Sequence, residues 1–187
     1  MPQHYDIHWL TQKIEQGESL KFLYFWGHTA PQDSSVGKHC LSQWYESRFI
    51  VAGIEYPTAE HWMMAQKALL FNDQLRFEKI IQARTAGEAK DLGRQVLGFE
   101  DQLWQEKRFD IVKQGNWHKF NQNPSLEAFL LQTGHRVLVE ASPVDRIWGI
   151  GLAESDPIIA RVEAWKGLNL LGFALMELRD MLRSAGG

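Results

Sequence analysis

The chain has 187 residues, 44% of them hydrophobic, and this length and composition favour one compact domain with a sizeable core. Its net charge of −3 argues against a module that holds nucleic acid by bulk positive charge, although a local basic cleft stays compatible with it. Cys40 is the single cysteine, which suits a reducing compartment. No secretory signal is read at the start, and no run reaches the ~18–20 apolar residues of a membrane span. We therefore expect a soluble cytoplasmic protein.

Helices and a hairpin are expected in the first half of the chain. The pattern predicts a short amphipathic helix over 6–16 and a strand over 21–26, followed by a polar loop. Two short strands, 47–51 and 54–56, flank a two-residue turn and lead into a helix that starts at Pro57 and is apolar on nearly every side. Further helices are predicted over 73–83 and 88–97, the second with a capping box formed by Thr85 and Glu88.

The second half continues the helical pattern. A long helix is predicted over 101–120, with an interruption at Gly115, and another runs from Pro124 to Gly134. A strand over 136–141 precedes a final helix over 169–182. The expected fold is therefore α+β, a single helix-dominated domain with one small β-sheet from the four strand regions. Residues 1–20 are expected to form an N-terminal extension to a domain over 21–187.

Glu60 and Lys67 stand seven residues apart in the apolar helix, so they lie close to one line along it. Because helical side chains lean toward the N-terminus, we expect Lys67 to reach back toward Glu60 across roughly 10 Å of axis. An acid and an amine in such a helix must pair, shift their pKa values or face a cavity. Two interpretations stay open: a carboxylate favoured by the helix dipole with a lysine that reaches solvent, or a desolvated lysine nucleophile beside a general acid/base.

A second group of candidate residues follows the strand over 136–141. The segment 140–151 holds two carboxylates, Glu140 and Asp145, together with Trp148 and glycines such as Gly149. Carboxylates held at a strand end can perform acid/base work, and glycines let a ligand approach the backbone. The alternative is a tight turn in which polar side chains bond their own backbone.

Several other residues are candidates for holding a base, a ribose or a phosphate. Asn169 is either an N-cap or part of a helix N-terminus that holds a phosphate or ribose. Trp104 and Arg108 share one helical face and either pack together or hold a ring and a phosphate. The candidate substrate-binding residues are Trp26, Gly27, Trp44, Arg48, Trp104, Arg108, Trp148, Gly149 and Asn169.

Three blocks occur in a fixed order: residues 56–68 (YPTAEHWMMAQKA), residues 140–151 with their carboxylates and W-G-I-G, and residues 165–172 with W-x-G-x-N-x-L-G. Together they resemble the NADAR family, also called YbiA-like, over about 21–182. Two parts depart from the family pattern. The first twenty residues have no counterpart there, and the loop over 29–40 is expected to alter the rim of the pocket.

The resemblance implies an enzyme, an N-glycosidase. Family members similar to this sequence cleave phosphoribosylaminopyrimidines, early riboflavin intermediates, to ribose 5-phosphate and a free aminopyrimidine. In such substrates C1′ carries an exocyclic amine, so it can open to an imine and exchange with a lysine. The resemblance marks Lys67 as the nucleophile. We expect Glu60 to carry the protons, and Asp145 and Glu140 are secondary candidates for orienting the ribose hydroxyls or a water.

Alternatives stay open at this stage. A two-carboxylate route would use Glu60 and Asp145 as acid and as nucleophile or base. Other family members remove ADP-ribose from guanine in nucleic acid, and a third possibility is a catalytically silent binder of ADP-ribose or nucleotide. We expect no cofactor and no metal, because the seven histidines show no metal-binding spacing. The expected partner is a small-molecule phosphoribosyl or ADP-ribosyl substrate, and nucleic acid is a partner if the chain removes ADP-ribose from guanine. No membrane association is expected, and the oligomeric state is open.

Overall fold

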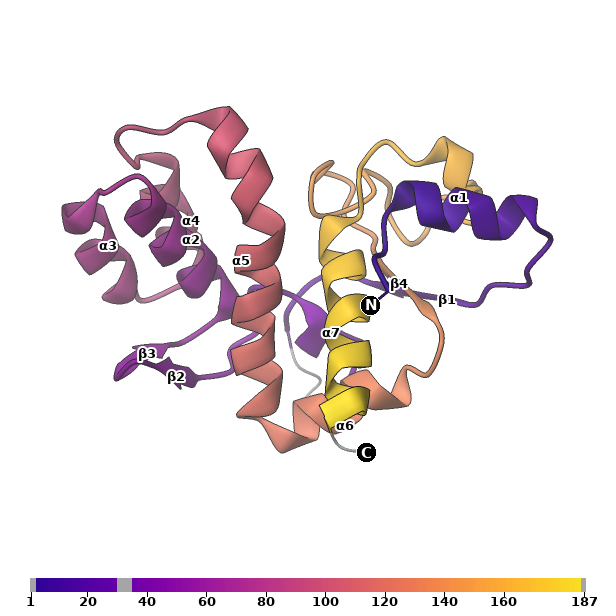
Figure 1. The fold of residues 1–187 in the computed structure, drawn as a ribbon, viewed down its shortest axis with the longest axis horizontal. Helices are drawn as coiled ribbons and strands as arrows, with labels where there is room; N and C mark the ends of the chain where they lie inside the picture. Colours follow the sequence, from indigo (N-terminus) through magenta and orange to yellow (C-terminus); the bar gives the residue numbers. More distant parts are fainter. Residues whose placement is uncertain (1–2, 30–34, 186–187) are drawn as a thin grey trace. The chain divides into compact units, whose positions relative to one another are not determined.

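The computed structural model describes residues 3–29 and 35–185, and the chain divides into two compact units (Figure 1). We call residues 43–124 the central unit, and residues 1–42 together with 125–187 the split unit. Helices dominate and strands are few, so the predicted α+β class is confirmed. The loop predicted over 29–40 lies partly outside the described residues, at 30–34.

The single small sheet predicted from the sequence is wrong, because the four strands form two separate sheets. In the central unit β2 (Phe49–Val51) and β3 (Ile54–Tyr56) pair as an antiparallel hairpin. The two turn residues, Ala52 and Gly53, both have positive φ, which suits the tight turn predicted there. The backbone N–H and carbonyl of Ile50, which face away from β3, are bonded to the Gln122 side chain and not to another strand.

Four helices complete the central unit: α2 (Ala59–Leu70), α3 (Gln74–Ile81), α4 (Ala86–Arg94) and α5 (Asp101–Asn121). Helix α2 contacts each of the other three, which agrees with its nearly all-round apolar surface. Helix α4 begins two residues before the predicted start, since the Thr85 side chain accepts the Glu88 N–H and the Glu88 carboxylate accepts the Arg84 N–H.

Two glycines let helices approach α2 closely. A Cβ on Gly115 of α5 would lie 2.3 Å from Trp62 Cδ1, and a Cβ on Gly93 of α4 would lie 2.0 Å from Met64 Sδ. The interruption predicted at Gly115 is therefore wrong. Helix α5 runs through this position without a break, and the missing side chain serves the packing of Trp62.

The split unit contains α1 (Ile7–Glu15), β1 (Phe22–Phe25), α6 (Pro124–Gln132), β4 (Val137–Glu140) and α7 (Leu170–Ala185), with 3₁₀ turns at Lys38–Leu41 and Val162–Ala164. Strands β1 and β4 pair in parallel, and α7 packs on β4. The packing is close, since a Cβ on Gly172 would lie 2.1 Å from the Leu138 carbonyl oxygen. None of the helices described is long and apolar enough to cross a membrane.

The start of the chain is attached to α7. Glu177 Oε1 lies 2.7 Å from His4 Nδ1, and the Tyr5 hydroxyl donates to the Asp180 carboxylate. Asp6 then caps α1 by accepting the Trp9 N–H. The first residues described are thus joined to the last helix of the same unit, while the boundary at residue 20 remains a prediction.

Candidate active site

Glu60 lies in the first turn of α2 and is almost completely buried, with 2% of its surface exposed. Its backbone N–H donates to the Gln43 carbonyl at 3.0 Å, which joins the helix start to the segment that follows the 3₁₀ turn. A carboxylate at the N-terminus of a helix is favoured by the helix dipole. Burial of a charged group is costly unless it is compensated, so this position is typical of a functional acid.

The first turn of α2 is fixed by a buried histidine. His61 Nε2 lies 3.1 Å from the Ala83 carbonyl, so Nε2 carries the proton and donates it there. Thr58 Oγ1 then donates to His61 Nδ1 at 2.8 Å and also accepts the His61 N–H as the helix cap. Burial lowers the pKa of His61. The neutral ring therefore holds the helix start in place beside Glu60.

Lys67 lies two turns further along α2 and is half-buried. Its Nζ donates to the Gly93 carbonyl at 3.0 Å and lies 4.3 Å from the ring centre of Phe99 and 5.6 Å from a ring of Trp104. The amine is therefore directed at the last turn of α4 and at two aromatic rings. Burial lowers the pKa of Lys67, which favours the neutral, nucleophilic amine.

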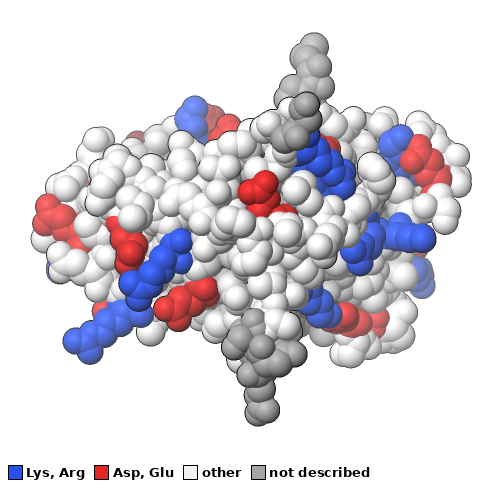
Figure 2. Space-filling model, turned by 90° about the horizontal axis from the view of Figure 1, so that it is seen from below, with Lys and Arg blue, Asp and Glu red and all other residues white. Residues whose placement is uncertain are grey.

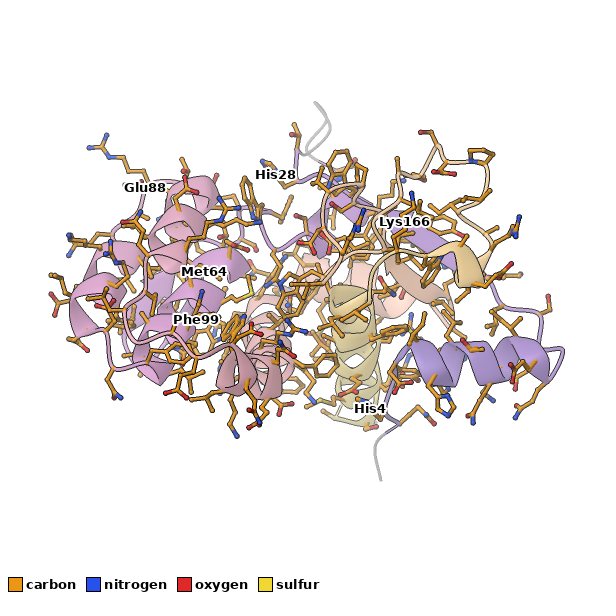
Figure 3. The ribbon with its side chains drawn as sticks, turned by 90° about the horizontal axis from the view of Figure 1, so that it is seen from above. His4, His28, Met64, Glu88, Phe99 and Lys166 are labelled. Carbon is orange, nitrogen blue, oxygen red and sulfur yellow. The ribbon has the colours of Figure 1, made fainter. Side chains whose placement is uncertain are left out.

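Phe99 is the residue of this site that the sequence did not indicate. It lies in the segment between α4 and α5, where no helical or strand periodicity applies, and Figure 3 labels it beside α2. Its ring packs edge-on against Phe71 at 5.2 Å, and 42% of its surface is exposed. The segment is anchored where Asp73 accepts the Leu97 N–H at 2.9 Å. An aromatic residue directly after a turn glycine was the only available signal.

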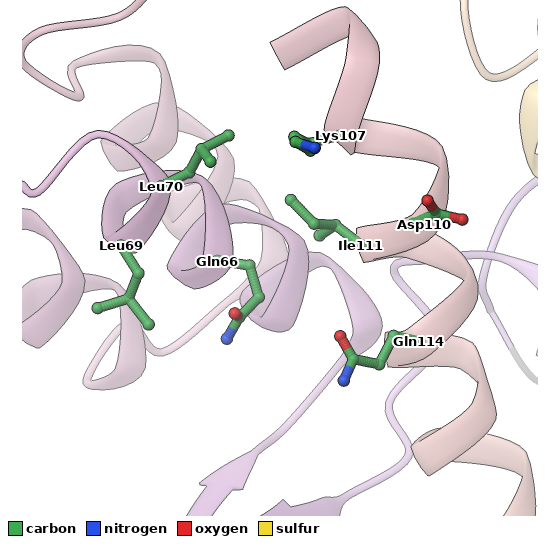
Figure 4. Close-up of a pocket in the computed structure, with 7 residues that line it drawn as sticks. All are labelled: Gln66, Leu69, Leu70, Lys107, Asp110, Ile111 and Gln114. Atoms are coloured by element: carbon green, nitrogen blue, oxygen red, sulfur yellow. The ribbon is translucent and has the colours of Figure 1, made fainter. Parts of the chain in front are cut away.

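A groove of about 380 Å³ lies between α2 and α5 (Figure 4). Its volume falls at the small end of the range for small-molecule sites. The lining contains one charge of each sign and two amides, so the groove has no net charge and does not indicate a phosphate site. The lining residues are Gln66, Leu69 and Leu70 of α2 and Lys107, Asp110, Ile111 and Gln114 of α5.

In the split unit Asp145 closes a turn. Its Oδ1 accepts the N–H groups of Ile147 and Trp148, both at 2.8 Å, while Ser142 Oγ accepts the Asp145 N–H at 3.2 Å. These bonds match the turn that was the alternative interpretation of this segment. The half-buried carboxylate is held at a fixed position by them, which an orienting role toward a sugar or a water would also need.

Asn169 ties the end of β4 to the start of α7. It is fully buried, its Oδ1 accepts the Glu140 N–H at 2.9 Å, and its Nδ2 donates to the Leu138 carbonyl at 2.9 Å. Its φ of +53° lies in the left-handed region, which asparagine tolerates better than most residues. Asn169 therefore positions the backbone of Glu140, and its contact with a substrate remains a prediction.

The second and third sequence blocks lie side by side in this unit. The N–H of Asn169 donates to the Gly149 carbonyl at 3.2 Å, and that of Lys166 donates to the Ile150 carbonyl at 2.9 Å. A Cβ on Gly167 would lie 2.3 Å from the Gly149 carbonyl oxygen. These glycines are needed because two backbone segments approach each other, which is a structural reason distinct from the approach of a ligand.

The predicted catalytic residues divide between the units, with Glu60 and Lys67 in the central unit and Glu140 and Asp145 in the split unit. The predicted substrate-binding residues divide in the same way. Trp44, Arg48, Trp104 and Arg108 belong to the central unit, and Trp26, Gly27, Trp148, Gly149 and Asn169 belong to the split unit.

The individual environments of these predicted binding residues differ. Trp26 is 54% exposed at the end of β1, and Gly27 follows it with a φ of +78°. A ring of Trp44 lies 5.6 Å from Lys90 Nζ. Arg48 forms an exposed ion pair with Glu55 at 2.8 Å. Only Trp104 lies close to the Lys67 amine among the contacts described above, so the direct role of the others stays a prediction.

Charge is mixed on the surface. On the face drawn in Figure 2, acidic and basic side chains are interspersed, and neither sign forms a continuous patch.

Across residues 3–29 and 35–185, no group of three or more His, Cys, Asp or Glu side chains is placed to hold a metal ion.

Comparison with known proteins gives one consistent family. Residues 24–183 match the NADAR domain. An N-glycosidase of Acanthamoeba polyphaga mimivirus is 43% identical over 87% of this chain and 97% of its own length. A riboflavin biosynthesis protein of Vibrio vulnificus is 32% identical over 76% of this chain and 35% of its own length. The NMR structure of the Escherichia coli protein YbiA matches with a TM-score of 0.70 and 28% identity, covering 89% of this chain and 87% of that one.

Proposed function

Since this chain belongs to the NADAR family and is an N-glycosidase, we propose that it hydrolyses the C1′–N bond of phosphoribosylaminopyrimidines and releases ribose 5-phosphate. The observation that carries this proposal is the Lys67 amine, which is desolvated between a carbonyl and two aromatic rings on the same helix as a buried carboxylate. Support for the substrate class comes from the riboflavin biosynthesis protein among the relatives.

The proposed reaction exchanges one amine for another at C1′. The sugar opens so that C1′ and the exocyclic nitrogen form an imine, and the neutral Lys67 amine adds to C1′. The bond from C1′ to the base nitrogen then breaks, the base leaves with a proton, and a new imine joins C1′ to Lys67. Water adds to this imine, the lysine amine leaves, and the sugar aldehyde is released. One water is consumed, and nothing is oxidised or reduced.

Glu60 is proposed to move the protons of this exchange. Its carboxylate is buried and its residue stands about 10 Å along the helix axis from Lys67. We therefore assign it to the leaving base or to the attacking water, with no direct bond to the amine. Glu140 and Asp145 are proposed to orient ribose hydroxyls or a water. The two-carboxylate route through Glu60 and Asp145 is the competing mechanism, and it requires no covalent lysine adduct.

Removal of ADP-ribose from guanine in nucleic acid is the competing function, and the basic residues offer it little support. A groove for a polymer needs positive charges that are available to phosphates. Among the basic residues, Lys38, Arg48 and Lys113 form ion pairs with Glu154, Glu55 and Asp110, and Lys119 is fully buried. Arg136 donates to the carbonyl groups of Thr133 and Gln132.

The experiment that tests the proposal is sugar release combined with borohydride trapping. Wild type should release ribose 5-phosphate from a phosphoribosylaminopyrimidine, and borohydride should fix the sugar on Lys67. Lys67→Met should abolish both. Lys90→Met is the matched control, because Lys90 is also half-buried beside a tryptophan ring and should be dispensable. An active Lys67→Met protein would exclude the imine mechanism. Sugar release from ADP-ribosylated DNA, without release from the phosphoribosylaminopyrimidine, would show that the ADP-ribosylated nucleic acid is the substrate.

A further inference from the structure

Two buried amides lie beside the start of α2 in the central unit. Asn116 of α5 is completely buried, and Gln43 is 6% exposed. Asn116 Nδ2 donates to Gln43 Oε1 at 2.7 Å and to the Val112 carbonyl at 2.9 Å. The backbone carbonyl of Gln43 in turn accepts the Glu60 N–H. The amide pair is therefore bonded to the segment that holds the buried acid.

The hydrogen bonds fix which way each amide points. Asn116 Nδ2 has two acceptors in reach, so a flipped amide would place its oxygen against two other acceptors, the Val112 carbonyl and Gln43 Oε1. This leaves Gln43 Nε2 as a donor and Asn116 Oδ1 as an acceptor. In the described part of the chain neither atom has a hydrogen-bond partner, and both are closed to solvent.

Buried polar atoms without a hydrogen-bond partner are rare, because they lower the stability of the fold. Such atoms are usually satisfied by a bound water or a ligand. An unsatisfied donor on one of two amides that are bonded at 2.7 Å, and an unsatisfied acceptor on the other, are complementary to a group that offers an acceptor and a donor. We propose that Gln43 and Asn116 recognise the lactam edge of the leaving base, with Gln43 Nε2 donating to its carbonyl oxygen and Asn116 Oδ1 accepting from its ring N–H.

The choice of a base edge over a sugar hydroxyl rests on the type of side chain. Paired amide donors and acceptors are the groups with which proteins read base edges, whereas carboxylates are the usual partners of ribose hydroxyls. Two aromatic residues, Trp44 and Tyr45, directly follow Gln43 in the chain and add flat surfaces to the same segment. The buried position of the amides also suits discrimination, because a ligand that lacks the edge would leave them unsatisfied.

This inference rests on the proposed function and makes it more specific. An aminopyrimidin-4-one and guanine both carry a carbonyl beside a ring N–H, whereas adenine carries no carbonyl. The pair therefore predicts that the enzyme requires a lactam in the leaving base. A substrate with the same sugar and an amino-substituted ring without the lactam should be poor.

The test compares two substrates in the full-length protein: the phosphoribosylaminopyrimidin-4-one and its O4-methyl ether, which has lost both the carbonyl and the ring N–H. Sugar release is measured for each as kcat/KM, and binding of each free base is measured separately by calorimetry. Wild type should prefer the lactam by about 10- to 100-fold in both measurements. Gln43→Met and Asn116→Leu conserve volume and should reduce this preference to near one.

Gln122→Met is the matched control. The Gln122 amide is satisfied at both ends by the Ile50 backbone, at 2.8 and 2.9 Å, so its loss should leave the preference unchanged. Thermal unfolding and circular dichroism check that each variant folds, and Gln43→Met supplies the result where Asn116→Leu does not fold. The inference would be overturned if Gln43→Met kept the preference for the lactam over the O4-methyl ether. It would also be overturned if Gln43→Met changed the preference for ribosyl over 2-deoxyribosyl substrates and left the lactam preference unchanged. If wild type released no sugar but still bound the lactam base more tightly than its methyl ether, the proposed function would be wrong and the inference on base recognition would stand.

Discussion

In the central unit the buried polar side chains Gln43 and Asn116 keep one atom each without a partner among the residues that the structure describes, whereas in the split unit Asn169 has both ends of its amide bonded to β4. The difference teaches that burial alone does not identify a functional residue. Polar groups that complete backbone hydrogen bonds stabilise the fold, and groups that retain bonding capacity are the candidates for chemistry.

Lys67→Met should give the largest effect and should separate function from stability. We expect sugar release to fall on the order of 10³-fold or more, because the proposed nucleophile is removed. Unfolding should show equal or higher stability than wild type, because burial of this amine lowers its pKa and so opposes the charged form at neutral pH. Parallel activity assays and denaturant titrations check both. A large loss of stability would place Lys67 with the structural residues.

Gly172→Ala should produce the largest loss of stability without a direct effect on chemistry. The new Cβ would meet the Leu138 carbonyl oxygen at 2.1 Å, and backbone atoms cannot yield as a flexible side chain can. We expect a loss of about 3 kcal/mol or more in the free energy of unfolding. Gly87→Ala is the matched helical control, since its Cβ would meet Trp44 at 3.7 Å and Thr85 Oγ1 at 3.8 Å, which are ordinary van der Waals distances. Equal stability of the two variants would contradict the close packing of α7 on β4.

Asn169 allows hydrogen bonding and backbone strain to be separated. Asn169→Gly keeps the left-handed conformation and loses two buried hydrogen bonds, so we expect a loss of about 2–3 kcal/mol. Asn169→Ala loses the same bonds and adds the strain of φ +53°, about 1 kcal/mol more. Urea titrations of both variants measure the difference. If the two unfold alike, the left-handed conformation carries no strain at this position.

Phe99→Ala should change the pH dependence of the reaction. Loss of the ring admits water to the Lys67 amine, so its lowered pKa should rise toward the ordinary lysine value. The neutral fraction at pH 7 then decreases, and we expect kcat/KM there to fall several-fold while the rising limb of the profile moves to higher pH. Leu75→Ala, another exposed apolar residue of this unit, is the control. An unshifted profile would remove Phe99 from the environment of the amine.

His61 gives the smallest expected effect, on stability alone. Its folded-state pKa is lowered by burial, so its contribution is present above the unfolded pKa near 6.5 and is lost as the pH falls from there toward the folded value. We expect the free energy of unfolding to decrease over that window, and His61→Gln to show a weaker decrease. Thermal unfolding between pH 5 and 7.5 measures this. A steeper decrease in the variant would assign the titration to another group.

Much of the fold follows from local signals in the sequence. The caps Asp6, Thr58 and Thr85, the turn at Ala52-Gly53 and the apolar character of α2 were all readable, since each depends on neighbours in the chain. The division of the four strands into two sheets could not be predicted from the sequence, because strand pairing depends on contacts between distant segments. The role of Gly115 was also hidden, since only the position of Trp62 explains it.

The candidate site shows the same division. Glu60 and Lys67 stood out because charged groups are unusual in an apolar helix, and their burial and contacts were then found in the structure. Phe99 and the amides of Gln43 and Asn116 gave no periodic signal, because they belong to a loop or meet across elements. The turn bonds of Asp145 belong to one of the two interpretations that the sequence left open, whereas the bonds of Asn169 to β4 appear only once the start of α7 is built.

Gly93 joins two constraints that are usually independent. Its missing side chain makes room for Met64, and its carbonyl oxygen receives the Lys67 amine. The spacing between α2 and α4 therefore also sets the location of the proposed nucleophile. A larger residue at position 93 would press on Met64 and would also shift the carbonyl that accepts the Lys67 amine, so substitutions there should change the helix packing and the position of this amine together.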